Sequence, residues 1–320
     1  MNHISRILVL SGLLVVAIPA TAQVPQPNQL ATLRKFDPSY RLPLEVDVLS
    51  DIVYANVDGR PVHLDLFSPN TGLGPFPAVL FIQGSGYNGN NKVHFWREAA
   101  HLASRGYVGI TIEHRGVASD GVVWPAPLSD SQLALQWLFD NASEFRIDPS
   151  RVVVVGASSG AHLAALLGST GVGQGVGGVS IRGVVAISGP LDLIYFGEHT
   201  VRSGDYGFVL DSAVFTPLLG ASYDQRPELW RAASPISYLN VRNPPILIIH
   251  GAADATLPIE QAQQYYNVAR EVGVAAEFVS IPGGGHEMTN THAYNEVLLR
   301  VEAFVQRVIG PGQHCFAVSC

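Results

Sequence analysis

The chain has 320 residues, of which 47% are hydrophobic and 14% are charged, and its formal net charge is -7. That much apolar surface can build a large core, so the composition excludes an intrinsically disordered chain. The negative charge, and the lack of a basic stripe with interleaved aromatic residues, argue against nucleic acid as a partner.

Residues 1–22 have the pattern of a secretory signal peptide. Arg6 and the amino terminus supply positive charge, residues 7–18 form an apolar run, and Ala20-Thr21-Ala22 suits signal peptidase. The apolar run is shorter than the roughly 20 residues of a spanning helix, which argues against a membrane anchor. We therefore expect a secreted or periplasmic protein whose mature chain begins at Gln23 and contains no membrane span.

Residues 23–46 are rich in proline and polar residues and are expected to form an extended lead-in. Beyond them, residues 48–55 and 62–67 are β-rich segments separated by Asp58-Gly59. An Asp-Gly pair between two such segments is a strong turn signal. The sequence therefore predicts an antiparallel hairpin at the start of one folded domain, residues 47–310.

Short apolar runs and helical patterns alternate after this hairpin. The runs are residues 78–82, 108–112, 152–155, 184–187, 246–249 and 278–281. The helical patterns are residues 94–105, 131–141, 160–168, 259–271 and 293–308. Continuous apolar runs are typical of strands that are buried on both faces. The alternation predicts a mostly parallel α/β sheet of about eight strands with helices on both faces.

Two segments interrupt this alternation. Residues 171–183 are rich in glycine but lack the Gly-Lys-Ser/Thr ending of a phosphate-binding loop, which favours a flexible connector. Residues 191–240 are too long for a simple crossover and carry several aromatic residues, which predicts an insertion with structure of its own. Those aromatic side chains either line an acyl pocket or pack the insertion, and packing is the default.

The tail, residues 311–320, contains the only two cysteines of the chain, Cys315 and Cys320. Export would bring them into an oxidising compartment, so we expect a small terminal disulfide, with two free thiols as the alternative. No CxxC motif or Cys/His cluster accompanies them, so no metal or redox cofactor is expected.

The segment Gly156–Gly160 has the form Gly-x-Ser-x-Gly, between an apolar strand and a helix of small residues. A strand, a tight turn and a helix in this order distinguish a nucleophile elbow from a chance match. The glycines avoid collisions where the chain passes close to its neighbours, and the serine is exposed above the sheet. We therefore predict Ser158 as a nucleophile, at a helix N-terminus that favours a negatively charged oxyanion.

A serine nucleophile needs a general base, and after an elbow of this kind the acid and then the histidine follow in the chain. Asp254 lies in the loop after the run 246–249, and His286 lies in the glycine-rich loop after the run 278–281. The carboxyl ends of parallel strands share one edge of the sheet. We therefore predict His286 as the general base and Asp254 as the acid that orients it.

Other polar residues compete for these roles. Asp192, after the run 184–187, is the rival acid. His162 lies in the helix after the elbow and is expected to be packed, and His250 is expected to tie the loop of Asp254. Glu287 is expected to face solvent.

The segment Gln83-Gly84-Ser85-Gly86-Tyr87 follows the predicted strand 78–82. Small residues at this place let backbone N–H groups point toward an acyl oxygen, as in an oxyanion hole. An ordinary glycine-rich turn is the alternative.

These motifs resemble those of the acetyl esterase and lipase group of α/β-hydrolases, near the feruloyl esterase, acetylxylan esterase and hormone-sensitive-lipase-like families. The resemblance covers about residues 48–309. Gly156–Ala164 is similar to Gly-x-Ser-Ala-Gly-Gly-His-Leu-Ala of those families, and residues 83–87 stand where they carry His-Gly-Gly-Gly-Trp. Ser234-Pro235-Ile236 and the loops of Asp254 and His286 also match. The resemblance implies the α/β-hydrolase fold and a reaction without metal or cofactor.

The resemblance also implies that the backbone N–H of Ser85 or Gly86, together with that of Ser159, binds the oxyanion. Gln83 in place of histidine and Ser85 in place of glycine are departures that leave the geometry of the hole open. Backbone donors, however, survive a change of side chain. Tyr87 stands where related esterases carry an aromatic residue beside this loop, so it is expected to contact substrate.

We therefore expect a serine esterase that hydrolyses short-acyl esters through an acyl-enzyme. Carbohydrate-linked acetyl or feruloyl esters are among the substrates that the resemblance implies. The alternatives are a lipase or polyester hydrolase with a longer groove, a serine exopeptidase, and a noncatalytic binding protein of the same fold. The ordered triad disfavours the binding protein, and the lack of room for a gating domain disfavours the exopeptidase. The oligomeric state stays open.

Overall fold

The structure is a computed structural model that describes residues 41–88, 92–170, 179–288 and 291–312. The expected signal peptide, most of the lead-in, residues 171–178 of the expected connector, and the pair Cys315 and Cys320 lie outside these ranges. In the described ranges, none of the helices combines the length and hydrophobicity that a membrane-spanning segment needs.

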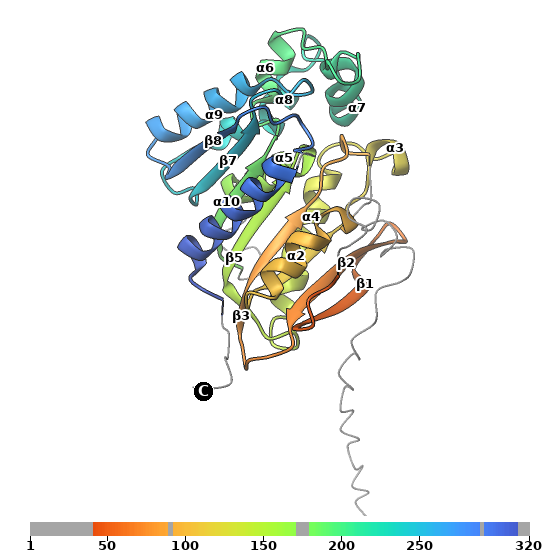
Figure 1. Cartoon of the computed structure of the whole chain (residues 1–320). Helices are drawn as coiled ribbons and strands as arrows, with labels where there is room; N and C mark the ends of the chain where they lie inside the picture. Colours follow the sequence, from red (N-terminus) through yellow and green to blue (C-terminus); the bar gives the residue numbers. More distant parts are fainter. Residues whose placement is uncertain (1–40, 89–91, 171–178, 289–290, 313–320) are drawn as a thin grey trace, which may run out of the picture.

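An eight-stranded sheet forms the centre of the described chain (Figure 1). Its strands are β1 (Val46–Val57), β2 (Arg60–Pro69), β3 (Phe76–Ile82), β4 (Val108–Ile112), β5 (Ile147–Ala157), β6 (Ile181–Ile187), β7 (Ile246–Gly251) and β8 (Ala276–Ile281). Their spatial order is β1-β2-β4-β3-β5-β6-β7-β8. β2 pairs antiparallel with β1 and β4, and the other neighbours pair in parallel. The prediction of a mostly parallel sheet is confirmed.

The predicted hairpin is formed by β1 and β2. Val57 pairs with Arg60, so Asp58 and Gly59 form a two-residue turn. Both have positive φ, 54° and 79°. Asp-Gly suits such a turn because aspartate tolerates the left-handed region and glycine enters it freely.

The continuous apolar runs bury side chains on both faces of the sheet. In β3, Ala78, Leu80 and Ile82 join one hydrophobic core, whereas Val79 and Phe81 join another. Successive side chains of a strand point to opposite faces, so a strand that is covered on both sides must be apolar throughout. This accounts for the runs seen in the sequence.

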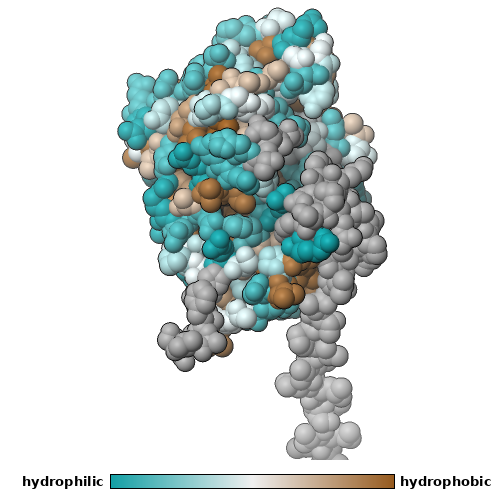
Figure 2. Space-filling model, viewed as in Figure 1, coloured by the Kyte–Doolittle hydropathy of each residue, from teal (hydrophilic) through white to brown (hydrophobic). Residues whose placement is uncertain are grey.

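Helices cover both faces. On one face lie the 3-10 helix η1 (Lys92–Phe95), α2 (Trp96–Ala103) and α10 (Thr291–Ile309), and on the other lie α4 (Ala126–Asp140), α5 (Ser159–Ser169) and α9 (Ile259–Glu271) (Figure 1). A short helix, α3 (Val117–Asp120), follows β4. The face seen in Figure 2 is mainly hydrophilic, with separate hydrophobic areas.

The structure differs from the sequence prediction in the bounds of several elements, among them β5, which begins at Ile147 and not at residue 152. The helix predicted at 94–105 divides into η1 and α2, and the helix predicted at 131–141 begins at Ala126. Pro127 lies in the first turn of that helix, where its missing N–H costs no hydrogen bond. β6 begins at Ile181, inside the expected connector. Gly183 lets β6 pack closely against α10, since an added Cβ would lie 2.8 Å from the Phe304 ring.

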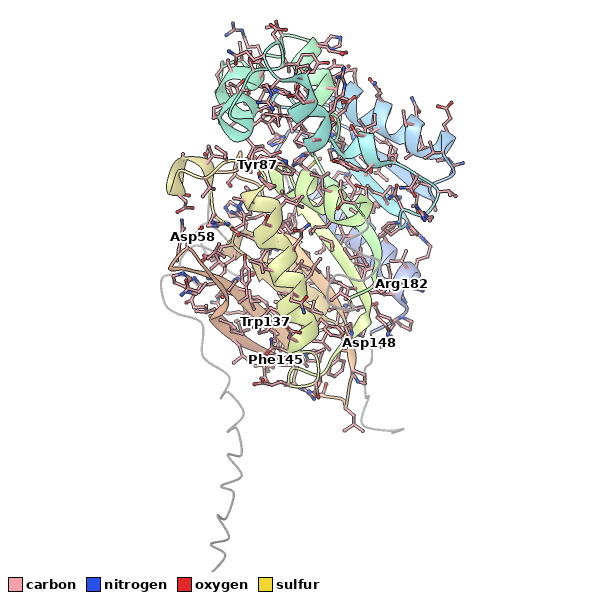
Figure 3. All side chains as sticks on the ribbon, turned by 180° about the vertical axis from the view of Figure 1, so that it is seen from behind. Asp58, Tyr87, Trp137, Phe145, Asp148 and Arg182 are labelled. Atoms are coloured by element: carbon pink, nitrogen blue, oxygen red, sulfur yellow. The ribbon has the colours of Figure 1, made fainter. Side chains whose placement is uncertain are left out.

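The insertion has a structure of its own at the carboxyl edge of the strands. It contains α6 (Leu193–Glu198), the π-helical turn η3 (Asp211–Phe215), α7 (Thr216–Leu219), α8 (Pro227–Ala233) and the 3-10 helix η4 (Pro235–Tyr238). Phe196, Phe215 and Trp230 pack together in a separate core, which is the default interpretation of its aromatic residues. Figure 3 shows Tyr87 where these helices meet the sheet, whereas Trp137 and Phe145 lie toward the opposite end.

Candidate active site

Ser158 lies on a strained turn between β5 and α5. Its φ is 51° and its ψ is -124°, a backbone conformation that is costly for a residue with a side chain. An added Cβ on Gly156 would lie 2.1 Å from the carbonyl oxygen of Gly160, and one on Gly160 would lie 2.1 Å from that of Ile82. No side chain fits at such distances, so both glycines of the Gly-x-Ser-x-Gly motif are needed for the chain to turn here.

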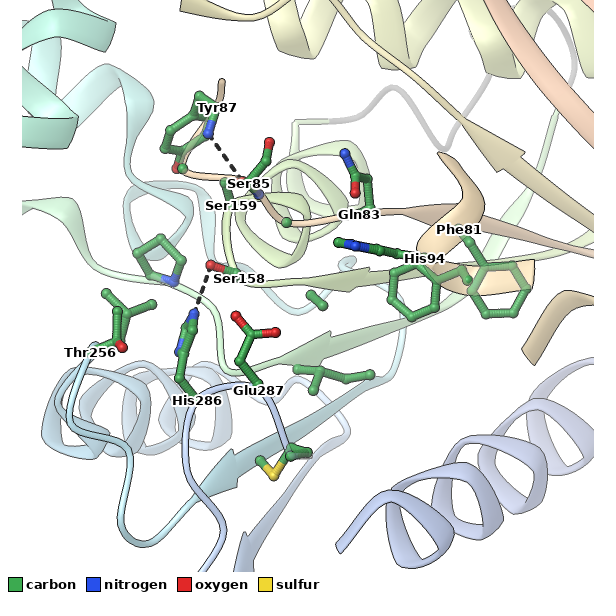
Figure 4. A pocket seen from close by; sticks show the side chains of 18 of the residues that line it. Phe81, Gln83, Ser85, Tyr87, His94, Ser158, Ser159, Thr256, His286 and Glu287 are labelled. Atoms are coloured by element: carbon green, nitrogen blue, oxygen red, sulfur yellow. Dashed lines mark hydrogen bonds between the residues drawn. The ribbon is translucent and has the colours of Figure 1, made fainter. Parts of the chain in front are cut away.

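The three residues predicted as a triad form one chain of hydrogen bonds. His286 Nε2 lies 3.0 Å from Ser158 Oγ (Figure 4), and His286 Nδ1 lies 2.9 Å from Asp254 Oδ2. Asp254 follows β7 and His286 follows β8, so the parallel sheet brings both loops to the edge where β5 ends. A neutral imidazole that donates from Nδ1 to the carboxylate has Nε2 free to accept the serine proton.

The side chain of Asp254 is buried and hydrogen-bonded. Its Oδ1 accepts the backbone N–H groups of Thr256 at 2.9 Å and Leu257 at 2.8 Å. Burial alone would raise the pKa of this carboxyl, but hydrogen bonds from His250 and His286 outweigh it and hold the pKa well below its usual range. Asp254 therefore stays a carboxylate that can orient His286 and stabilise its protonated form.

His250 ties the loop of Asp254 to the end of β7. Its buried Nε2 lies 3.0 Å from the carbonyl oxygen of Leu257 and 3.2 Å from Asp254 Oδ2. The Nε2–H group of His250 is thus shared between the Leu257 carbonyl oxygen and the Asp254 carboxylate. This is the role expected from the sequence, and it leaves His286 as the histidine that reaches Ser158.

The rival residues support the insertion instead. His162 Nε2 donates to the carbonyl oxygen of Ala233 at 2.6 Å, and burial lowers the pKa of His162 to about 4. Asp192 caps α6 by accepting the backbone N–H groups of Ile194 and Tyr195 at 3.0 and 3.3 Å. Neither residue belongs to the hydrogen-bond chain of Ser158.

The loop after β3 passes directly over the nucleophile. An added Cβ on Gly84 would lie 2.5 Å from Ser158 Cβ, so only glycine fits. Ser85 N–H donates to Ser159 Oγ at 3.0 Å, and Tyr87 N–H donates to the same oxygen at 3.3 Å (Figure 4). The sequence indicated a backbone role for Ser159 but not this one for its hydroxyl. The only sign of this role in the sequence is that Ser159 replaces the alanine that follows the nucleophile in the related motif Gly-x-Ser-Ala-Gly.

Tyr87 borders the same cavity as Ser158 but is only 1% exposed. Its ring stands edge-on to that of His162, with 5.6 Å between ring centroids. The structure therefore shows Tyr87 mainly as a wall of the site, packed against the insertion.

Ser158 and His286 open into a cavity of about 980 Å³. On one side Leu210, Phe215 and Leu257, each less than 5% exposed, line the cavity beneath the insertion. On the other side it extends between η1 and α10, where Val93 and Leu298 line it. No sequence pattern indicated this second side. Glu287 is exposed at its rim, as expected (Figure 4).

The low pKa of Asp254 links this site to stability. A carboxyl whose pKa is lower in the folded than in the unfolded chain stabilises the fold at any pH above its unfolded-state pKa, here 3.8. This contribution is lost as the pH falls from 3.8 toward the folded-state pKa. The difference in free energy of unfolding between wild type and Asp254→Asn should therefore shrink below about pH 3.8. Urea unfolding of both proteins from neutral pH to about pH 3 measures it, and a difference independent of pH would contradict this account.

Comparison with known proteins places the chain in a family. A model of the family described as BD-FAE matches residues 64–268, which is more than half of the chain. Esterase LipC of Mycobacterium tuberculosis is 29% identical over 66% of this chain and 53% of its own length. Isoprenylcysteine alpha-carbonyl methylesterase ICME of Arabidopsis thaliana is 26% identical over 75% of this chain and 56% of its own. This chain thus spans about half the length of the curated relatives that it matches.

A solved structure supports the same grouping. A truncated carbohydrate esterase from gut microbiota is 27% identical and superimposes with a TM-score of 0.68, over 81% of this chain and 96% of that one. The sheet order, the elbow at Ser158 and the family match agree. The chain belongs to the BD-FAE family, within the esterase and lipase group of α/β-hydrolases.

Proposed function

We propose that the protein is a carboxylic-ester hydrolase that works through an acyl-enzyme on Ser158. The observation that carries this proposal is the hydrogen-bond chain from Ser158 through His286 to Asp254, at 3.0 and 2.9 Å. The names of the relatives, esterases and a methylesterase among them, support the same chemistry.

Acylation begins when Ser158 Oγ attacks the ester carbonyl while His286 Nε2 takes its proton. The carbonyl oxygen becomes an oxyanion at the N-terminus of α5, where free N–H groups and the helix dipole stabilise negative charge. Asp254 stabilises the imidazolium that forms. The C–O bond to the alcohol then breaks, and His286 delivers the proton to the departing alcohol oxygen.

Deacylation repeats these steps with water. His286 Nε2 takes a proton from water, whose oxygen attacks the acyl carbon of the Ser158 ester. The second oxyanion collapses, the bond to Ser158 Oγ breaks, and His286 returns the proton to the serine. The products are the free acid and the unchanged enzyme.

We propose short-acyl esters as substrates. Beneath the insertion the cavity is lined by Leu210, Phe215 and Leu257, which are buried in a packed core, so this side should accept only a short acyl chain. The other side, between η1 and α10, can then take the alcohol part. Carbohydrate-linked acetyl or feruloyl esters fit this assignment, and the 27% identical carbohydrate esterase supports it.

We also propose that the enzyme acts outside the cytoplasm, in the periplasm or after secretion. The proposal rests on the pattern of residues 1–22, with Arg6 before an apolar run and Ala20-Thr21-Ala22 after it. A disulfide between Cys315 and Cys320 would form on the same route.

Replacing the nucleophile tests the proposed reaction. Ser158→Ala should lower kcat on p-nitrophenyl acetate by several orders of magnitude and abolish labelling by a fluorophosphonate, because no other hydroxyl bonds to His286 Nε2 in the described chain. Ser212→Ala, at an exposed serine of the insertion, is the matched control and should behave as wild type. Full activity in a folded Ser158→Ala protein would refute the proposed function.

The acyl preference is tested with p-nitrophenyl esters of increasing chain length. Acetyl to butyryl esters should give higher kcat/KM than chains of about eight carbons or more, because each methylene without room costs on the order of 1 kcal/mol. Phe215→Leu should shift the optimum to longer chains, whereas Leu298→Ala, on the other side of the cavity, should leave it in place. A kcat/KM that rises steadily to the decanoate in wild type would favour a lipase-like groove instead.

A further inference from the structure

The side chain of Ser159 has no part in the reaction just described, yet it is built into the site. Ser159 is 2% exposed, and its Oγ accepts two backbone N–H groups of the loop after β3, from Ser85 at 3.0 Å and from Tyr87 at 3.3 Å. We infer that the Ser159 hydroxyl is a positioning residue that fixes this loop and thereby sets the oxyanion hole. The inference rests on the proposed esterase function.

The loop needs such a fixing contact because its backbone is strained. Tyr87 has a φ of 63° although it carries a side chain, whereas Gly86 before it adopts its φ of 60° freely. Non-glycine residues in this region persist only where the surroundings hold them. Ser85 O accepts Asn88 N–H at 3.1 Å and Tyr87 O accepts Val117 N–H at 2.7 Å, which fixes the far side of the turn. Ser159 Oγ fixes the side that faces the nucleophile.

The two bonds also decide which N–H groups remain for the substrate. Ser85 N–H is engaged by Ser159 Oγ. Across the described ranges, no hydrogen bond involves the N–H of Gly86 or of Ser159, and both residues line the cavity beside Ser158. Ser159 N–H is in the first turn of α5, which has no intrahelical acceptors, and two such unpaired donors beside the nucleophile can both donate to a substrate oxygen. The structure assigns the hole to Gly86 N–H and Ser159 N–H and leaves Ser85 out.

One residue therefore controls both donors. Ser159 supplies the first through its own backbone, and its hydroxyl holds the neighbours of Gly86, which supplies the second. The contact between Ser159 Oγ and the loop after β3 thus fixes the distance between Gly86 N–H and Ser159 N–H. A donor pair that is fixed in advance stabilises an oxyanion without reorganisation during the reaction.

Ser159→Ala tests the inference because it removes the hydroxyl and keeps the backbone N–H. We expect kcat on p-nitrophenyl acetate to fall about 10- to 100-fold with KM changed by less than about threefold, since the contact acts on the transition state. The Ki of a trifluoromethyl ketone, which forms an oxyanion in the hole, should rise by the same factor as kcat/KM falls. The pH profile of kcat/KM should keep its shape, because His286 and Asp254 are untouched.

Two further variants keep the test decisive. Ser159→Thr retains the hydroxyl and should stay within a few-fold of the wild-type kcat, whereas Ser159→Cys retains the shape with a weak acceptor and should lose activity like Ser159→Ala. An unchanged or raised kcat in Ser159→Ala and Ser159→Cys would overturn the inference, because Ser85 N–H would then be free to serve as the donor. A loss confined to KM would overturn it as well. The proposed esterase function is tested independently by Ser158→Ala, and activity that survives that substitution would refute it.

Discussion

The turn at Ser158 leaves no room for side chains around it, and the rest of the site depends on that constraint. An added Cβ at Gly160 would meet the Ile82 carbonyl oxygen, and one at Gly84 would meet Ser158 itself. The end of β3, the start of α5 and the loop after β3 are therefore in backbone contact. This contact pushes Ser158 out above the sheet, points the N-terminus of α5 at its hydroxyl, and brings the oxyanion loop over it.

The parallel sheet supplies the rest of the geometry. Ser158 and His286 are 128 residues apart in the chain, yet they meet because β5 and β8 run in the same direction and end at one edge. The neighbouring loops are then fixed by buried polar contacts: His250 holds the loop of Asp254, and His162 holds the insertion at Ala233. A rigid sheet and a few buried hydrogen bonds thus position a site that is made of loops.

The sequence predicted those parts of the molecule that local patterns encode. The hairpin turn at Asp58-Gly59, the alternating strands and helices, and the placement of Asp254 and His286 after successive strands all follow from short motifs and their order. The role of Ser159 could not be derived in this way, because its hydroxyl acts on N–H groups 72 and 74 residues earlier in the chain. The cavity between η1 and α10 was missed for the same reason, since it arises where two helices distant in sequence pack on one face.

The central claim is that Ser158 carries the acyl group between two half-reactions. It is tested most directly by rapid mixing of the enzyme with excess p-nitrophenyl acetate, followed by acid quenching and mass mapping of the peptides. The account predicts a burst of p-nitrophenol close to one equivalent per enzyme, provided that deacylation is the slower step, and an acetyl group on the peptide that contains Ser158. An acetyl group trapped on a different residue, with Ser158 unmodified while turnover continues, would contradict it.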